Sequence, residues 1–512
     1  MVYVDTIDPN PDPQTQLPDP SILRKLILVA SIASGVQFGW ALQLSLLTPY
    51  TQLLGLGHKW ASLVWLCGPI SGLVVQVIVG HHSDRCMSSL GRRRPFILGG
   101  AISLTFGVLC IGYAADIGNY LGDSINNGVR YWAATIFIIG FWMLDISNNI
   151  IQGPTRALLA DISDGNDAMV TIGNGLFAFF MAVGNISGYA TGASEWLHHY
   201  LPFTTTEACD YSCAHIKSCF LVSIVLMGMI VTLVLVFIKE APLDPFYLDY
   251  IRESYDEKAP SFFMQILIAA KGTSKPMWVL YVVTALNWIG IFPFLLYDTD
   301  WMGKEVYGGN VTGNREELNL YHMGVRAGSM GLVVHVLTMG TVSLFLEPLI
   351  RLIGNVKRLW SIGNFVLAIC MALTVVISMT AEKSRKEALL ALGTTLVPPP
   401  IEVRAYCYGL FALFGIPQAV TYCIPFALAS IYSKDGNTGQ GLALGLLNLA
   451  IVIPQMVVTL VSGPLDSLFR GSNLPAFIWG GIAAAFGGYA ALKLPDPVWE
   501  IMPRAISRVL IP

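Results

Sequence analysis

Residues 141–161 read FWMLDISNNIIQGPTRALLAD. This run is long enough to cross a bilayer as an α-helix, yet Asp145 and Arg156 place charges inside it. Ionisable residues at bilayer depth are costly, and they normally mark a functional site. Counting from Asp145, polar residues follow at i+3, i+4, i+7 and i+11, on one helix face: Asn148, Asn149, Gln152 and Arg156. A membrane helix that is polar on one face indicates a water-filled or substrate-filled cavity, and therefore a transporter.

The composition of the chain is that of an integral membrane protein. Hydrophobic residues make up 54% of the 512 residues and charged residues 12%, against about 25% charged residues in soluble proteins. The net charge of -3 gives no indication of nucleic-acid binding. Clustered metal ligands, nucleotide loops and nucleophile–base motifs are absent from the sequence, so we expect no metal cofactor and no enzyme.

Apolar segments that can each cross about 30 Å of hydrocarbon occur twelve times. They lie at 26–54, 60–81, 95–115, 131–160, 168–193, 217–238, 277–300, 320–346, 358–381, 404–432, 439–464 and 474–493. We therefore expect an all-α membrane protein with two six-helix halves, 26–238 and 276–494. A polar loop at 239–275 joins them, and we expect a disordered N-terminal tail at 1–25 and a C-terminal tail at 495–512.

Lys and Arg are unevenly divided between the two sides of these spans. The side that holds both termini collects the larger share, so we expect both termini in the cytoplasm. Cys209, Cys213 and Cys219 then lie in an outer loop, where two of them could form a disulfide, and the sequence leaves open which. A glycosylation sequon at Asn310 falls on the same outer side.

The turn after the second span carries a local motif, GHHSDR at 80–85 followed by GRRR at 91–94. It resembles the G-x-x-x-D-R-x-G-R-R loop of the major facilitator superfamily, with a longer spacer between its two parts. An aspartate there can pair with a basic residue and hold two helix ends in one of two arrangements. The predicted conformational gate consists of Asp84, Arg85, Gly91, Arg92 and Arg93. The alternative is that the arginines only fix the topology. A fainter counterpart at Glu347–Arg358 indicates an internal repeat.

Several further stretches resemble the plant sucrose–proton symporters, in the glycoside-pentoside-hexuronide branch of that superfamily. They are QFGWALQLSLLTPY at 37–50, WLCGPISG at 65–72, GPTRALLAD at 153–161, DTDWMG at 298–303 and LLNLAIVIPQ at 446–455. The likeness extends from Leu26 to Leu494. Three positions depart from the family pattern, namely Val77, Thr155 and His335. The departure at His335 bears on which sugar the protein prefers or on how transport responds to pH.

The resemblance implies a symporter that moves sucrose, and other glucosides, together with a proton by alternating access. The bilayer, the sugar and the co-transported proton are then its partners, and no cofactor is needed. Asp145 matches the family's proton-coupling aspartate and Arg156 its helix-4 arginine. His58, Asp298 and Arg326 match further positions near the sugar. The alternatives are a helix-end contact for Asp298 and a side chain that reaches the membrane surface for Arg326.

Sugar recognition needs amides for hydroxyl groups and a flat apolar surface for the ring. Gln37, Asn148, Asn149 and Gln152 offer the amides, and Trp40 offers the surface. The alternatives are interhelical hydrogen bonding for Asn149 and Gln152 and ordinary packing for Trp40.

Two other functions are compatible with the same sequence, a proton-independent sugar facilitator and a non-transporting membrane sugar sensor. We expect the plasma membrane as the location, with the vacuolar membrane as the alternative, because relatives occupy both. The sequence does not fix the oligomeric state.

Overall fold

The structure is a computed structural model. It describes residues 20–53, 67–123, 130–163, 166–193, 197–209, 211–240, 242, 264, 271–310, 314–392, 396–433, 439–468 and 472–495. In these ranges the regular structure is helical, apart from one isolated bridge between Thr206 and Cys209. The predicted site residue His58 lies outside the described residues, as do most of the central loop and nearly all of both predicted tails.

The N-terminal half is a bundle of long helices. It contains α1 (Pro20–Ala30), α2 (Ile32–Leu53), α4 (Cys67–Asp84), α5 (Arg94–Gly112), α7 (Tyr131–Ile162), α8 (Asp167–Ala193) and α10 (Tyr211–Phe237). The first helix begins at Pro20, inside the segment 1–25 that we predicted to be a disordered tail, because proline is well suited to the first turn of a helix. Three short elements complete the half: α6 (Ala114–Tyr120), α9 (Leu197–Tyr200) and η2 (Pro202–Thr204).

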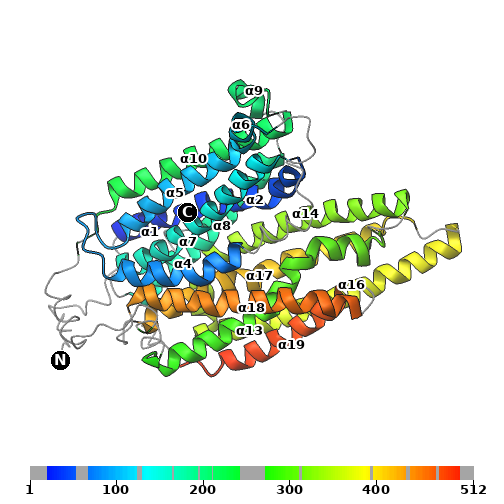
Figure 1. The fold of residues 1–512 in the computed structure, drawn as a ribbon. Helices are drawn as coiled ribbons and strands as arrows, with labels where there is room; N and C mark the ends of the chain where they lie inside the picture. Colours follow the sequence, from blue (N-terminus) through cyan, green and yellow to red (C-terminus); the bar gives the residue numbers. More distant parts are fainter. Residues whose placement is uncertain are drawn as a thin grey trace, which may run out of the picture.

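The C-terminal half repeats this arrangement. It contains α13 (Lys275–Trp301), the π-helical turn η3 (Met302–Val306), α14 (Arg315–Leu344), α15 (Leu346–Ile353), α16 (Val356–Leu392), α17 (Ile401–Tyr432), α18 (Gln440–Leu468) and α19 (Leu474–Ala491). Figure 1 shows the N-terminal half above the C-terminal half. Eleven helical segments of the described chain are long and apolar enough to cross a membrane. The remaining predicted span is α4, which ends in the polar sequence His-His-Ser-Asp.

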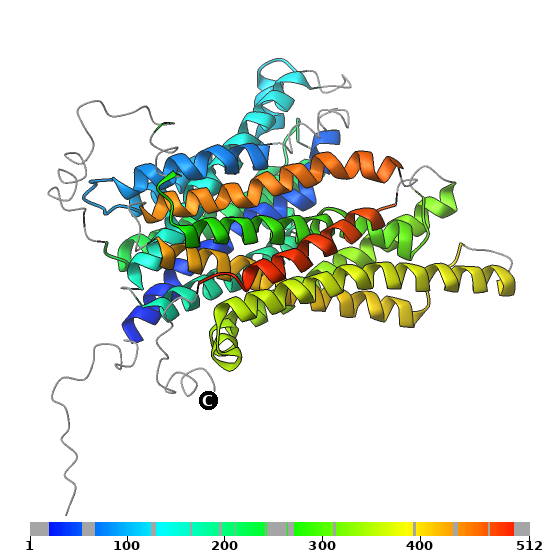
Figure 2. The same cartoon turned by 90° about the horizontal axis from the view of Figure 1, so that it is seen from below.

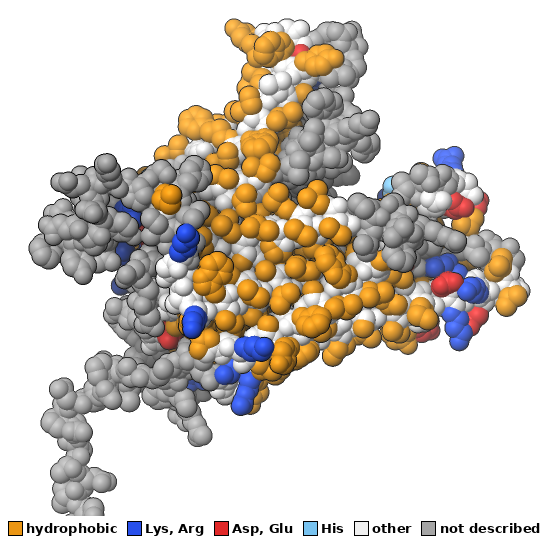
Figure 3. All heavy atoms as spheres, turned by 60° about the horizontal axis from the view of Figure 1, so that its bottom comes forward, with side chains coloured by type: hydrophobic (Ala, Val, Ile, Leu, Met, Phe, Trp, Pro, Cys, Tyr) orange, Lys and Arg blue, Asp and Glu red, His pale blue; other side chains and the backbone are white. Residues whose placement is uncertain are grey.

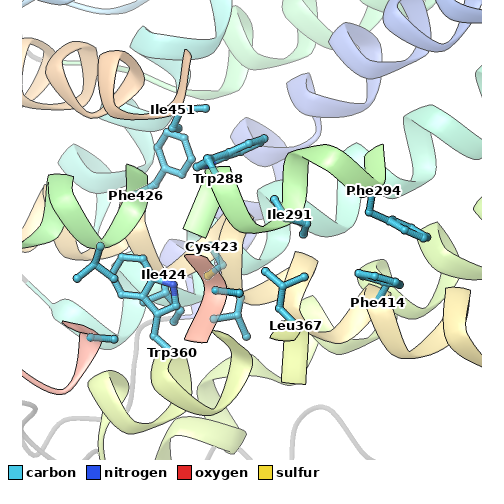
Figure 4. Close-up of a cluster of buried hydrophobic side chains, with 14 of the residues drawn as sticks. Trp288, Ile291, Phe294, Trp360, Leu367, Phe414, Cys423, Ile424, Phe426 and Ile451 are labelled. Atoms are coloured by element: carbon cyan, nitrogen blue, oxygen red, sulfur yellow. The ribbon is translucent and has the colours of Figure 1, made fainter. Parts of the chain in front are cut away.

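Each half has its own buried apolar core. In the C-terminal core the ring of Phe294 stacks on that of Phe414 at a centroid distance of 3.7 Å, and Figure 4 shows both rings at one end of the cluster and Trp360 at the other. The outer surface is also apolar. In Figure 3 hydrophobic side chains cover the middle of the face in view, and most charged side chains lie near its ends, as expected for a surface in contact with lipid.

One helix is much longer than a membrane crossing requires. The 37 residues of α16 correspond to roughly 55 Å of helix, against about 30 Å of hydrocarbon. Its last turns carry exposed ion pairs, Lys386 with Glu382 at 2.7 Å and Lys383 with Glu387 at 3.9 Å. Arg385 fixes this extension to η3 by donating hydrogen bonds to two backbone carbonyl groups at 2.8 Å.

The two halves meet where α4 packs against α18 and where α8 packs against α14 and α17. Figures 1 and 2 both show α4 and α18 side by side. Glycine makes this contact close: a Cβ atom at Gly80 would lie 2.3 Å from the carbonyl oxygen of Gly441, and one at Gly445 would lie 2.9 Å from the Cα atom of Val77. Small residues allow membrane helices to approach in this way.

This close approach yields a test of the inter-half contact. Gly80→Ala places a methyl group against backbone atoms that cannot move aside, so we expect the state in which α4 and α18 touch to lose about 1–3 kcal/mol. Transport should fall, roughly tenfold if about 1.4 kcal/mol is lost. The control is Gly99→Ala on α5, because no atom lies within 4 Å of the added Cβ there. Equal uptake by both variants, at equal amounts in the membrane, would contradict this role of Gly80.

Candidate functional site

Asp145 lies on α7 and is buried, with 4% of its surface exposed. Gln43 of α2 donates a hydrogen bond from Nε2 to its Oδ1 at 3.4 Å. Gly68 of α4 lies close by, since a Cβ atom there would be 3.6 Å from the other carboxylate oxygen. The carboxylate is therefore enclosed by three helices of the N-terminal half.

Asn149, one turn further along α7, is fully bonded to its surroundings. Its Nδ2 donates to Oγ of Ser71 at 3.0 Å and to the backbone oxygen of Asp145 at 2.9 Å. Its Oδ1 accepts a hydrogen bond from Nε2 of Gln76 at 2.8 Å. Asn149 thus links α7 to α4. Asn148 differs, because it is 1% exposed and neither atom of its amide has a hydrogen-bond partner among the described residues.

Arg156 is buried without a carboxylate partner in the described part of the chain. Its Nη1 donates to Oδ1 of Asn174 at 2.9 Å and to the backbone oxygen of Tyr422 at 3.3 Å. Its guanidinium carbon lies 4.1 Å from the ring centre of Phe177 and 3.6 Å from that of Phe426. Asn174 and Phe177 belong to α8, whereas Tyr422 and Phe426 belong to α17. The guanidinium therefore contacts both halves.

A small pocket lies at the junction of the two halves. It is lined by residues of α4, α7, α17 and α18: Gln76, Gln152, Gly153, Arg156, Phe426, Leu444 and Asn448. Beside it, Asn448 donates a hydrogen bond to the backbone oxygen of Gly72 at 2.6 Å. The pocket brings together two of the predicted sugar-binding residues, Gln152 and Arg156.

The other predicted binding residues do not line this pocket. Gln37 (8% exposed) and Trp40 (41% exposed) lie on α2. Asp298 of α13 is 5% exposed and accepts a hydrogen bond from the adjacent backbone N–H of Thr299 at 2.5 Å. Arg326 of α14 is exposed.

The turn between α4 and α5 holds a buried charge network. Arg93, 1% exposed, forms ion pairs with Asp84 at 2.6 Å and with Asp161 at 3.1 Å. Its backbone N–H donates to the carboxylate of Glu240 at 2.9 Å, and Arg92 pairs with Asp161 at 3.2 Å. Gly91 has a positive φ of 103° and packs against Glu240, a position that suits only glycine.

The same Asp84 carboxylate reaches the other half of the molecule. It accepts hydrogen bonds from the backbone N–H groups of Gly441 and Leu442, both at 2.9 Å, in the first turn of α18. A carboxylate is favourable there because the first N–H groups of a helix lack intrahelical partners and carry partial positive charge. Arg85 is exposed and donates a hydrogen bond to Nε2 of His81 at 3.0 Å.

The fainter counterpart in the second half makes a different contact. Glu347 pairs with Arg351 on α15 itself. The first turn of α8, which is the equivalent of α18, is capped by Asn166, whose Oδ1 accepts from the N–H groups of Ala168 at 3.0 Å and Met169 at 3.2 Å. The two halves are therefore not equivalent at this end.

The three positions that depart from the family pattern have separate environments. His335 is 3% exposed, 6.3 Å from Phe294 between ring centres, inside the C-terminal core and away from the small pocket. The Thr155 hydroxyl donates to the backbone oxygen of Ile151 at 2.7 Å. Val77 packs beside Gly445 at the inter-half contact.

The cysteine pairing that the sequence left open is between Cys209 and Cys213, whose Cα atoms are 5.1 Å apart. Cys219 is a buried free thiol that contacts the backbone oxygen of Thr191 at 3.6 Å. The described residues contain no group of three or more His, Cys, Asp or Glu side chains that could hold a metal ion.

Two six-helix halves, joined by a polar junction and a charged turn, define a transporter of the major facilitator superfamily. A family model described as "MFS/sugar transport protein" matches residues 28–293. The structure is similar to the E. coli fucose:proton symporter (TM-score 0.61, 13% identity, 93% of this chain and 100% of that chain). It is equally similar to a proton:xylose symporter (TM-score 0.61, 14% identity, 93% and 96%). At these identities the likeness shows the fold.

Sequence comparison identifies the family. The chain is 45% identical to "Sucrose transport protein SUT2" of Oryza sativa subsp. indica over 92% of each chain. It is 43% identical to "Sucrose transport protein SUC4" of Arabidopsis thaliana over 92% of this chain and 90% of that protein. The chain belongs to the sucrose transport protein family, so it is a multi-pass membrane transporter and not an enzyme.

The charge network predicts that Asp84 is more important than its neighbour Arg85. Asp84→Asn weakens both the ion pair to Arg93 and the capping of α18, and charged hydrogen bonds of this kind contribute about 1.5–3 kcal/mol each. We expect the maximal uptake rate to fall at least tenfold for a loss of about 1.4 kcal/mol. Arg85→Gln should retain most of the activity. Uptake by the two variants, normalised to the amount in the membrane, decides the point, and a greater loss in Arg85→Gln would refute the assignment.

Proposed function

We propose that the chain is a proton-coupled symporter of sucrose and related glucosides that works by alternating access, with Asp145 as the proton carrier. The observation that carries this proposal is a buried carboxylate at membrane depth, enclosed by α2, α4 and α7. A carboxylate in such a place needs a functional reason, because burial of its charge is costly. The names of the relatives, which are sucrose transport proteins, support the choice of substrate.

The hydrogen bonds around Asp145 suggest how proton and sugar binding depend on each other. Gln43 donates a hydrogen bond to one oxygen of this carboxylate, and the proposal assigns the transported proton to the same carboxyl group. A protonated carboxyl group can donate a hydrogen bond to a sugar hydroxyl, whereas the ionised form only accepts. Protonation therefore changes the hydrogen bonds that the site offers to the sugar, without any covalent step.

A chain of polar contacts connects this site to the contact between the halves. Asn149 bonds to the backbone of Asp145 and to Ser71 and Gln76 on α4. On α4, the backbone oxygen of Gly72 accepts a hydrogen bond from Asn448 of α18. A change at Asp145 that moves α4 would therefore act directly on the contact that must open in alternating access.

Different observations support sugar-binding roles for Asn148, for Gln152 and for Arg156. Asn148 has an amide without a partner among the described residues, and Gln152 and Arg156 line the small pocket. The side chain of Asn149 is already hydrogen-bonded to α4, which favours a role in holding the two helices together over a role in sugar binding. Gln37 and Trp40 of α2 remain proposed contacts with the sugar. The proposed roles of His58, Asp298 and Arg326 follow from the family pattern alone.

The orientation follows from the charged turn. We propose that the Asp84 network and both termini lie in the cytoplasm, so the structure is closed on the cytoplasmic side. The proton gradient then drives uptake toward that side, with about 2.3 kcal/mol per charge for each 100 mV of membrane potential. The plasma membrane remains the proposed location, with the vacuolar membrane as the alternative.

Proton coupling is tested by current recordings in oocytes that express the chain. Sucrose at acidic pH should evoke an inward current, and Asp145→Asn should abolish it, because the amide cannot take up and release a proton. Glu402→Gln, which neutralises an exposed carboxylate at the start of α17, should leave the current intact. Uptake of labelled sucrose without current in the wild type would establish a facilitator, and binding without uptake a sensor. An undiminished current in Asp145→Asn would remove that residue as the proton carrier.

The role of Trp40 is tested by the concentration dependence of uptake. Trp40→Ala should raise the KM for sucrose roughly tenfold, equivalent to about 1.4 kcal/mol of lost contact with the sugar. Trp40→Phe should restore part of the affinity. Trp132→Ala, at an exposed tryptophan in the first turn of α7, is the control. If Trp40→Ala has the wild-type KM, Trp40 serves only in packing.

A further inference from the structure

Three side chains form a stack that joins the two halves. The guanidinium carbon of Arg156 lies 4.1 Å from the ring centre of Phe177 and 3.6 Å from that of Phe426. Arg156 and Phe177 belong to the N-terminal half, and Phe426 belongs to the C-terminal half. We call these three residues the aromatic clamp. Its Phe426 contact links the halves at a place distinct from the capping of α18 by Asp84.

The two rings add to the attraction that the hydrogen bonds of Arg156 provide. Its hydrogen-bond partners, Asn174, Tyr422 and Met181, are all neutral. A cation over an aromatic face is attracted to it, and most strongly where water is excluded. Arg156 is 4% exposed, and Phe177 and Phe426 are 1% and 9% exposed. An aliphatic side chain in place of Phe426 would fill similar space but would not attract the charge.

The clamp lies between the proton site and the charged turn. On α7, Arg156 follows Asp145 by 11 residues and precedes Asp161 by 5. At 1.5 Å per residue the clamp is about 16 Å from the level of Asp145 and about 8 Å from that of Asp161, which pairs with Arg92 and Arg93. Opening the molecule on the side of the charged turn must therefore separate Phe426 from Arg156.

We propose that Phe426 is a positioning residue, which holds Arg156 across the interface while the molecule is closed on the side of Asp84. When the halves separate on that side, Arg156 loses its contacts with Phe426 and Tyr422 and keeps those with Phe177 and Asn174. The face of its guanidinium that Phe426 covered then becomes available to sugar hydroxyl groups. The stack thereby links release of the inter-half contact to the sugar contact of Arg156. This inference rests on the proposed function, since it assigns a regulatory neighbour to a proposed sugar-binding residue.

The experiment measures hydrogen–deuterium exchange in the purified full-length transporter. The amides of Gly441 and Leu442 are bonded to Asp84 only while the halves are closed on this side. In Phe426→Leu the peptide that contains them should exchange about tenfold faster, as expected for about 1.4 kcal/mol of lost attraction. Phe426→Trp keeps an aromatic face, so in this variant the same peptide should exchange at about the wild-type rate.

Two matched controls separate the clamp from general loss of packing. Phe414→Leu removes a buried ring of the same helix, α17, that stacks on Phe294 within the C-terminal core. Phe177→Leu removes the clamp ring that lies in the same half as Arg156. Both should leave exchange of the Gly441 peptide at the wild-type rate. In transport assays from the side opposite Asp84, Phe426→Leu should raise the KM for sucrose about tenfold, because fewer molecules face that side, whereas Phe414→Leu should keep the wild-type KM.

The outcomes distinguish this proposal from the proposed function. Wild-type exchange in Phe426→Leu, or equally fast exchange in Phe426→Trp, overturns the clamp. Faster exchange in Phe414→Leu also overturns it, because the effect would then be one of packing. Faster exchange in Phe426→Leu alone, in a protein that transports no sucrose, supports the clamp and rejects the function. If Phe426→Leu does not elute as a folded protein, Arg156→Lys, which keeps the charge but loses the planar stack, must accelerate exchange, and slow exchange there overturns the proposal.

Discussion

The two helix N–H groups that bond to Asp84 are the constraint around which this end of the molecule is organised. The first turn of α18 lacks intrahelical partners for these groups, and the partner that satisfies them comes from the opposite half. Asp84 can reach them because Gly80 and Gly441 let the backbones of α4 and α18 approach. Arg93, bonded to Asp84 and Asp161, keeps the carboxylate in place. Charge, capping and close packing therefore depend on one another here.

A single helix combines several tasks along its length. Asp145 of α7 lies in the proposed proton site, Asn149 links the helix to α4, Arg156 contacts α8 and α17, and Asp161 belongs to the charged turn. These groups follow one another along a single helix from Tyr131 to Ile162, which has Pro154 inside it. A displacement of this helix would act on several of them together, as the alternating access proposed above requires.

Charges were the part of the site that sequence could predict, because a charged residue in an apolar run is visible without a structure. The polar face of α7 and the Asp84 turn follow from such signals, whereas the twelve spans follow from the lengths of the apolar runs. Gln76, a polar residue in the apolar stretch of α4, is a similar signal. The partners were not predictable. Glu240 lies 147 residues from Arg93, and Phe177 and Phe426 look like ordinary core residues, since an aromatic side chain in an apolar helix has no distinguishing pattern.

The extension of α16 has a practical consequence. Its final turns form a charged helical extension on the face opposite Asp84, and Arg385 binds this extension to η3. None of the residues in the proton site, the small pocket or the charged turn belongs to it. An antibody fragment raised against this extension would add mass and a fiducial shape for electron cryomicroscopy while leaving the charged turn and the small pocket free, so that the states of the proposed transport cycle could be imaged with the same reagent.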